Sequence, residues 1–106
     1  MSEYAYIKAL RTLLLLERPT AQVRINSCGE LWIKTREHPR TEVFVWCSYY
    51  SSLRPKYSVR AVSTSAHVIL HEICHGYARR DDRWFEHGLR ETRDLLVRFV
   101  DAAEIS

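Results

Sequence analysis

The spacing of hydrophobic positions along this chain changes twice. Residues 2–18 repeat apolar side chains at intervals of three and four, which predicts an amphipathic helix. Ser2 is placed to cap this helix, and Pro19 is placed to end it. From residue 22 the pattern becomes an alternation of apolar and polar positions, which is typical of strands with one buried face.

Three alternating segments, rich in β-branched and aromatic residues, predict an antiparallel meander of three strands. They are residues 22–26, 31–34 and 42–49. Cys28-Gly29 predicts the first turn, and a charged, proline-bearing stretch over 35–41 predicts the second. Residues 51–60 contain Pro55 and several polar side chains, so we expect a loop there.

Helical spacing returns at Ser63, which offers a cap together with the two hydroxyl residues after it. The polar run 79–83 is expected to end this helix, and a last helix is expected over 88–103. The fold class that follows is α+β, with an N-terminal helix, a small three-stranded antiparallel sheet and two further helices. We expect a single domain over residues 1–106.

Composition narrows the class of protein. Of 106 residues, 46% are hydrophobic and 27% are charged, which are ordinary values for a globular domain and exclude disordered or collagen-like chains. The net charge is only +3. A charge this small does not support a dedicated nucleic-acid binder, so nucleic acid is a weak candidate for a partner.

Cysteine usage points to a reducing compartment. The three cysteines, Cys28, Cys47 and Cys74, are an odd number and no two have CxxC spacing, so they predict neither a disulfide framework nor a zinc ribbon. The apolar run Leu13–Leu16 is too short to span a membrane or to form a signal-peptide core. We therefore expect a cytoplasmic protein.

The segment His71-Glu72-Ile73-Cys74-His75 is an HExxH motif within the second predicted helix. Residues four apart share one helix face, so His71 and His75 can direct ring nitrogens at the same metal ion. Neutral imidazoles suit zinc, and Glu72 is placed to accept a proton from a water molecule as general base. The competing interpretation is a helix with two incidental surface histidines.

The metzincin variant of this motif does not fit the chain. Ala78 stands where that pattern requires glycine, and Asp81 stands where it requires a third histidine. The only methionine is Met1, so the Met-turn of that family is also missing.

The third metal ligand must then come from another downstream residue. The candidates are His87, Asp81, Glu86 and Glu91. We favour His87, because imidazole is a common zinc ligand and Gly88 allows the chain to turn directly after it. A loop of eleven residues between His75 and His87 is long enough to return the chain to the metal. Glu91 and Asp81 remain alternatives.

The HExxH segment, the polar loop after it and the pair His87-Gly88 resemble the core of the SprT-like metallopeptidases. The resemblance implies a zincin-like fold with zinc on His71, His75 and His87 and with Glu72 as catalytic base. One departure is Glu91, which stands where that family usually has Phe or Trp.

These observations predict a zinc-dependent metallopeptidase that hydrolyses peptide bonds. Its substrate would be a protein or peptide, held in extended form along 42–49 as an edge strand. The alternative is a non-catalytic binding protein that keeps the zincin fold and its zinc for stability. The presence of Glu72 favours the enzyme, because a structural metal site needs no general base.

Several other residues have both a chemical and a plainer structural interpretation. His67 shares the motif's helix face and can support a ligand, although packing is the simpler role. Cys74 is expected to be a buried thiol. Candidate donors to an oxyanion are Tyr49, Tyr50, Tyr57 and Tyr77. A small anion-facing loop is a further candidate, made of Arg54, Lys56 and Arg60.

Overall fold

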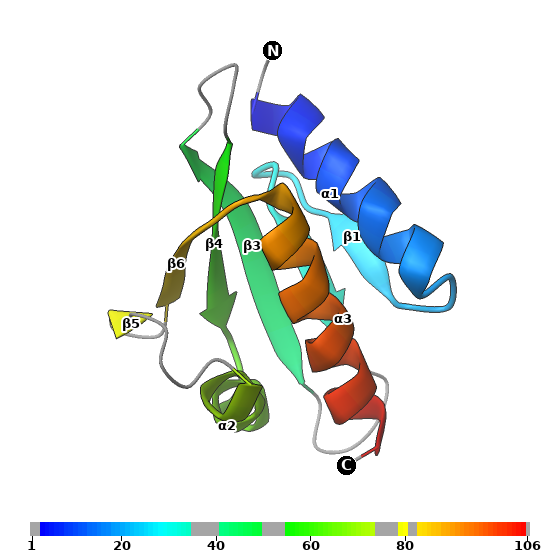
Figure 1. Ribbon diagram of the computed structural model, residues 1–106, viewed down its shortest axis with the longest axis vertical. Coiled ribbons are helices and arrows are strands. Elements are labelled where there is room, and N and C mark those ends of the chain that lie inside the picture. Colours follow the sequence, from blue (N-terminus) through cyan, green and yellow to red (C-terminus); the bar gives the residue numbers. More distant parts are fainter. Residues whose placement is uncertain (1–2, 35–40, 50–54, 74–78, 81–82, 106) are drawn as a thin grey trace.

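The computed structural model describes residues 3–34, 41–49, 55–73, 79–80 and 83–105. Within this part the chain forms three helices and six strands (Figure 1). In chain order they are α1 (Glu3–Glu17), β1 (Val23–Ile25), β2 (Leu31–Lys34), β3 (Glu42–Tyr49), β4 (Lys56–Ala61), α2 (Thr64–Ile73), β5 (Arg79–Arg80), β6 (Arg83–His87) and α3 (Leu89–Ile105). The predicted α+β class is confirmed; the predicted cap Ser2 lies outside the described residues.

The sheet contains more strands than the sequence predicted. Strands β1 to β4 form an antiparallel meander, β6 pairs with β4, and β5 pairs with β6. The prediction of three strands was therefore wrong. Residues 56–61 form β4 because Tyr57, Val59 and Ala61 alternate into the core, and Pro55 precedes the strand, where it removes no ladder hydrogen bond.

The polar run 79–83 also differs from its prediction. Arg79 and Arg80 form β5, and Arg83 begins β6, so the chain reverses as a pair of antiparallel strands. Strand β6 also pairs with β4, which lies more than twenty residues earlier in the sequence.

Strand β3 occupies the middle of the sheet. The strand order is β1-β2-β3-β4-β6-β5, so β3 pairs with β2 on one side and with β4 on the other. The expectation that 42–49 is an edge strand for a substrate was therefore wrong, because β2 pairs with residues 42–45 and β4 pairs with residues 43–49. Within the described chain, the edges of the sheet are β1 and β5.

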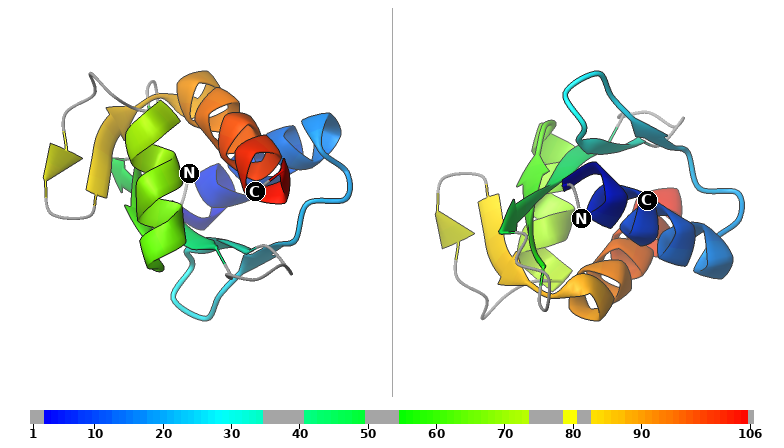
Figure 2. Two further views of the ribbon diagram at one scale, coloured as in Figure 1. Left: turned by 90° about the horizontal axis from the view of Figure 1, so that it is seen from below. Right: turned by 90° about the horizontal axis from the view of Figure 1, so that it is seen from above.

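All three helices gather on one side of a curved sheet (Figure 2). Helix α1 contacts β1, β3 and α3, whereas α2 contacts β4 and α3. The core lies between them because alternate strand residues point toward the helices. Its fully buried members include Ile7, Leu10, Leu14, Leu31, Ile33, Val43, Val45, Val59, Leu70, Leu96 and Phe99. None of the helices in the described residues has the length and apolar character needed to cross a bilayer.

The turn between β1 and β2 is stabilised by one side chain. The Oδ1 atom of Asn26 accepts hydrogen bonds from the backbone N–H of Cys28 at 3.0 Å and of Glu30 at 2.9 Å. Gly29 has a φ of 80°, a conformation that glycine adopts without strain. The predicted Cys28-Gly29 turn is confirmed.

An ion pair joins the end of α1 to α3. Arg18 donates from Nε to Oδ1 of Asp101 and from Nη2 to Oδ2, both at 2.7 Å. These hydrogen bonds from the guanidinium lower the pKa of the Asp101 carboxyl below its usual range. The bidentate geometry fixes the two helices relative to each other.

We predict that Asp101→Asn reduces stability at neutral pH and that the difference disappears in acid. The folded-state pKa of Asp101 is lowered below its unfolded value of about 4. The pair therefore stabilises the fold above that value, and the stabilisation is lost as the pH falls through the folded-state pKa. The effect is small, because the two side chains are 37% and 43% exposed.

Urea unfolding of the wild type and of Asp101→Asn at pH 7 and at pH 3 measures this effect. Asp94→Asn is the matched control, because the ion pair of Asp94 is with its neighbour Arg93 on the same helix. A difference between wild type and Asp101→Asn that grows as the pH is lowered would contradict the prediction.

Candidate metal centre

Helix α2 carries the first half of the HExxH motif. The helix begins where Ser63 Oγ accepts a hydrogen bond from the N–H of Ala66 at 3.2 Å, so the predicted cap is confirmed. The same oxygen accepts a hydrogen bond from the N–H of Glu42 at 3.2 Å. This second contact ties the start of α2 to the start of β3.

The core and the motif use different faces of α2. Ala66, Ile69 and Leu70 are buried against the sheet and α3. His71 and Glu72 are both exposed. Since successive helix residues turn by about 100°, these two side chains point away from the buried face. His71 is therefore not a packed core histidine, and its imidazole is accessible to a metal ion.

His75 lies outside the described residues. Four positions separate it from His71, so a continuation of the helix would place both histidines on the same exposed face. His67, one turn before His71, is half-buried. It lines a surface cavity of about 280 Å³ at the start of α2, together with Ala61, Val62, Ser63 and Thr64.

For His87, the structure describes the backbone only. It is the last residue of β6 and pairs with Tyr57 near the start of β4. Helix α2 leaves from the other end of β4, after Ala61. Tyr57 and Ala61 are four positions apart in the strand, which corresponds to about 13 Å. The backbone of His87 therefore lies at the end of β4 opposite to the end from which α2 leaves.

The other three candidate ligands differ in position. Glu86 belongs to β6, and the structure describes its backbone only. Asp81 lies outside the described residues, but it follows Arg80 and precedes Arg83, whose backbone pairs with Arg60 beside the end of β4. Glu91 is exposed in the first turn of α3. A carboxylate there interacts favourably with the helix N-terminus, which is sufficient to explain its presence.

Among the described side chains, no three His, Cys, Asp or Glu residues lie together as a metal site. The described side chains do not include His75, Asp81 or the imidazole of His87. The zinc site on His71, His75 and His87 therefore stays a prediction. The donor types nevertheless fit zinc, because an accessible histidine and an adjacent carboxylate stand on a helix.

Of the four tyrosines named as donors to an oxyanion, the structure describes the side chain of Tyr57. Tyr57 is fully buried and its hydroxyl donates to the backbone carbonyl of Tyr6 at 2.9 Å. Burial raises the pKa of this hydroxyl, so Tyr57 joins β4 to α1 and is not available to an oxyanion. Tyr49 is described by its backbone only. The candidates outside the described residues are Tyr50, Tyr77, Cys74 and Arg54.

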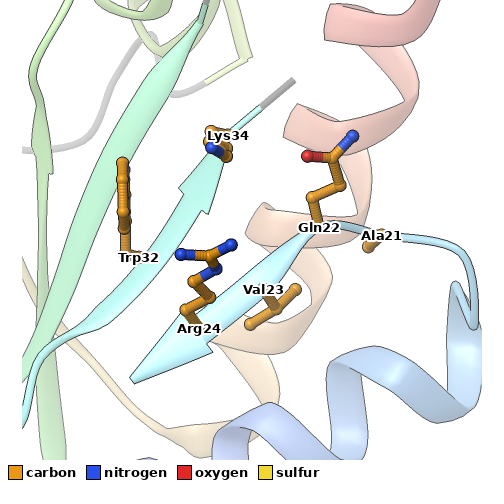
Figure 3. Close-up of a pocket in the computed structure, with 6 residues that line it drawn as sticks. All are labelled: Ala21, Gln22, Val23, Arg24, Trp32 and Lys34. Carbon is orange, nitrogen blue, oxygen red and sulfur yellow. The ribbon is translucent and has the colours of Figure 1, made fainter. Parts of the chain in front are cut away.

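The prediction that residues 51–60 form a loop was wrong for residues 56–60, which form part of a strand. Lys56 and Arg60 belong to β4, and Arg60 is exposed on the side of the sheet away from the core. Sequence reasoning also missed a cavity beside Trp32 on the same side. Its residues come from β1, from the two residues before β1 and from β2, and the pairing of the two strands brings them together (Figure 3).

Comparisons with protein-family models, with curated proteins and with solved structures found no match to this chain.

We predict that His71→Ala changes the unfolding free energy of the metal-free protein by less than about 0.5 kcal/mol, as for other exposed positions. Its neighbour Leu70 is fully buried, so Leu70→Ala is the matched control and should cost about 2–5 kcal/mol. Chemical denaturation in the presence of a chelator measures both. A loss with His71→Ala as large as that with Leu70→Ala would place His71 in the core and remove the case for a ligand.

Proposed function

We propose that this protein is a zinc-dependent metallopeptidase with a zincin-like arrangement of α2 and the sheet. The proposal is carried by one observation: His71 and Glu72 are adjacent and exposed on the face of α2 that the core does not use. The motif supplies His75 one turn later. A pair of imidazoles and a carboxylate in this pattern suits metal-assisted hydrolysis.

The residues would divide the chemistry between them. His71 and His75 would hold zinc, which when bound polarises a peptide carbonyl and lowers the pKa of water. Glu72 would accept the proton of the attacking water and then deliver it to the leaving amine. Its exposed position on α2 leaves room for both water and substrate.

The third ligand is proposed to be His87, as the resemblance to SprT-like metallopeptidases implies. Asp81 is its main competitor, because the neighbours of Asp81 pair beside the end of β4 from which α2 leaves. Carboxylate oxygen is an acceptable ligand for zinc.

A peptide substrate requires a free strand edge if it binds by main-chain pairing. Strand β3 does not provide one over residues 43–45, since it pairs there with β2 as well as with β4. Strand β5 is the edge strand that follows α2 in the chain. We therefore propose β5 as the strand that holds a protein or peptide substrate.

We predict that Glu72→Gln retains zinc and the fold but lowers peptide hydrolysis by at least about 100-fold, the usual contribution of a general base. Gln has nearly the same shape but does not accept the proton. The matched control is Glu104→Gln, which removes an equally exposed carboxylate from α3. Cleavage of a panel of unfolded protein substrates gives the rates, and elemental analysis gives the zinc content.

Two results would contradict the enzymatic role. Equal cleavage by the wild type and Glu72→Gln would show that Glu72 is not the base. A wild-type protein that holds zinc and cleaves no member of the panel would favour the alternative, a zinc-stabilised binding protein without turnover.

We also predict that His87→Ala weakens zinc affinity by far more than the 10- to 100-fold expected, roughly, for loss of a supporting group. Asp81→Ala and Glu91→Ala are made in parallel, and competition with a chromogenic chelator measures all three affinities. If Asp81→Ala has the large effect and His87→Ala a small one, the site is of the His-His-Asp type and the resemblance to SprT-like enzymes is misleading. A large effect of Glu91→Ala alone would make it His-His-Glu.

A further inference from the structure

Helix α2 carries a second pair of histidines at metal-binding spacing. His67 and His71 are four residues apart, and both lie within the described helix, Thr64–Ile73. Residues four apart on a helix have Cβ atoms about 5–6 Å from each other on one face, so both imidazoles can bind the same ion. This upstream pair lies one turn before the HExxH histidines and shares His71 with them.

Both members of the upstream pair lie outside the core face of α2. The buried residues of the helix are Ala66, Ile69 and Leu70. His71 is exposed and His67 is half-buried. Val68, which lies between them in the sequence, is 50% exposed, so this side of the helix meets solvent. An ion therefore reaches the pair without displacing a core side chain.

Space for further ligands lies beside His67. The cavity of about 280 Å³ at the start of α2 is lined by His67, by Ser63 and by Thr64, among others, and it has room for several water molecules. An ion held by two imidazoles needs oxygen or nitrogen ligands in its remaining positions. Water in the cavity can supply them next to the first imidazole.

The charges of the helix permit a cation at the pair. Helix α2 contains Glu72 and has neither lysine nor arginine, so no fixed positive side chain of the helix itself repels an ion. The partial positive charge of a helix N-terminus opposes a cation, but it falls off within the first turn. His67 and His71 stand at the fourth and eighth positions of α2, so the second imidazole lies beyond that turn.

The ligand chemistry selects the kind of ion. Imidazole suits zinc, copper and nickel, whereas calcium and magnesium take oxygen ligands. A histidine that binds a metal through one ring nitrogen commonly keeps a hydrogen bond through the other. The upstream pair therefore fits a transition-metal ion and leaves the second nitrogen of each ring for the protein or water.

We propose that His67 and His71 form a second site for a divalent ion of the zinc, nickel and copper class. A neutral imidazole offers one nitrogen to a metal, because the other carries a proton. An ion on the upstream pair and an ion on His71 and His75 therefore exclude each other. Excess metal on the upstream pair would take His71 from the proposed zinc, a consequence that rests on the proposed function.

The test uses a protein in which the proposed zinc site is broken. The background variant His75→Ala/His87→Ala removes two of the three proposed zinc ligands and keeps the upstream pair. Nickel alone is the probe, and calorimetric titration gives its affinity and stoichiometry. We expect one equivalent to bind. Nickel at about a hundredfold excess over the dissociation constant should raise the melting temperature by about 10 °C, because the pair exists only in the folded helix.

Single substitutions in this background identify the ligands. His67→Ala and His71→Ala should each weaken nickel binding at least about tenfold, because two ligands on one scaffold bind far more tightly than one. His38→Ala is the matched control, which removes a histidine from outside α2 and should leave the affinity unchanged. His67→Gln is made beside His67→Ala, and circular dichroism confirms the fold of each protein. His75→Ala alone is prepared as a second background, since it also breaks the HExxH pair.

A measurement on the background protein itself needs no further substitution. Nickel is paramagnetic and broadens the magnetic resonance signals of nearby nuclei. The ring signals of His67 and His71 should broaden at the lowest nickel concentrations, and that of His38 should not. This result locates the ion directly.

Three outcomes would overturn the inference. They are a dissociation constant for nickel weaker than about 1 mM in the folded background protein, equal affinity with and without the His67 imidazole, and broadening confined to other histidine rings. A wild type that lacks zinc on His75 and His87 would leave all three results as expected. Failure of this inference is therefore distinguishable from failure of the proposed function.

Discussion

The shared burial of one row of side chains fixes the rest of this structure. Leu31, Val45 and Val59 are directly paired across β2, β3 and β4 and are fully buried beneath the helices. Strand residues alternate between the two faces of the sheet. A slip of one residue in the strand pairing would therefore expose these buried side chains and bury those of the outer face. The same register that builds the core therefore also aligns Trp32 and Phe44 with arginines on the outer face.

The parts of the fold that the sequence predicted are those with a clear local period. Helices α1 and α3 and strands β1 to β3 lie close to their expected ranges. Strand β4 was missed because Pro55 and polar residues obscured an alternation that starts only at Tyr57. Strand β6 pairs with β4, and no local pattern reveals a partner more than twenty residues away. Strand β5 has only two residues and pairs with β6.

In the candidate metal centre, too, local features could be predicted from the sequence and long-range ones could not. A helix with His71 and Glu72 on its exposed face is predictable from the spacing of the motif and of Ile69 and Leu70. The proposed third ligand, His87, belongs to β6. The position of β6 is set by its pairing with β4, which is a long-range contact.

Zinc content after reconstitution tests the metal centre most directly. Elemental analysis of the wild type should give one equivalent of zinc per chain, and chelation should lower its melting temperature, because the metal would join α2 to the segment after it. The double variant His71→Ala/His75→Ala should retain none. Well under half an equivalent in the wild type, or a full equivalent in the double variant, would contradict a zinc site on the HExxH motif.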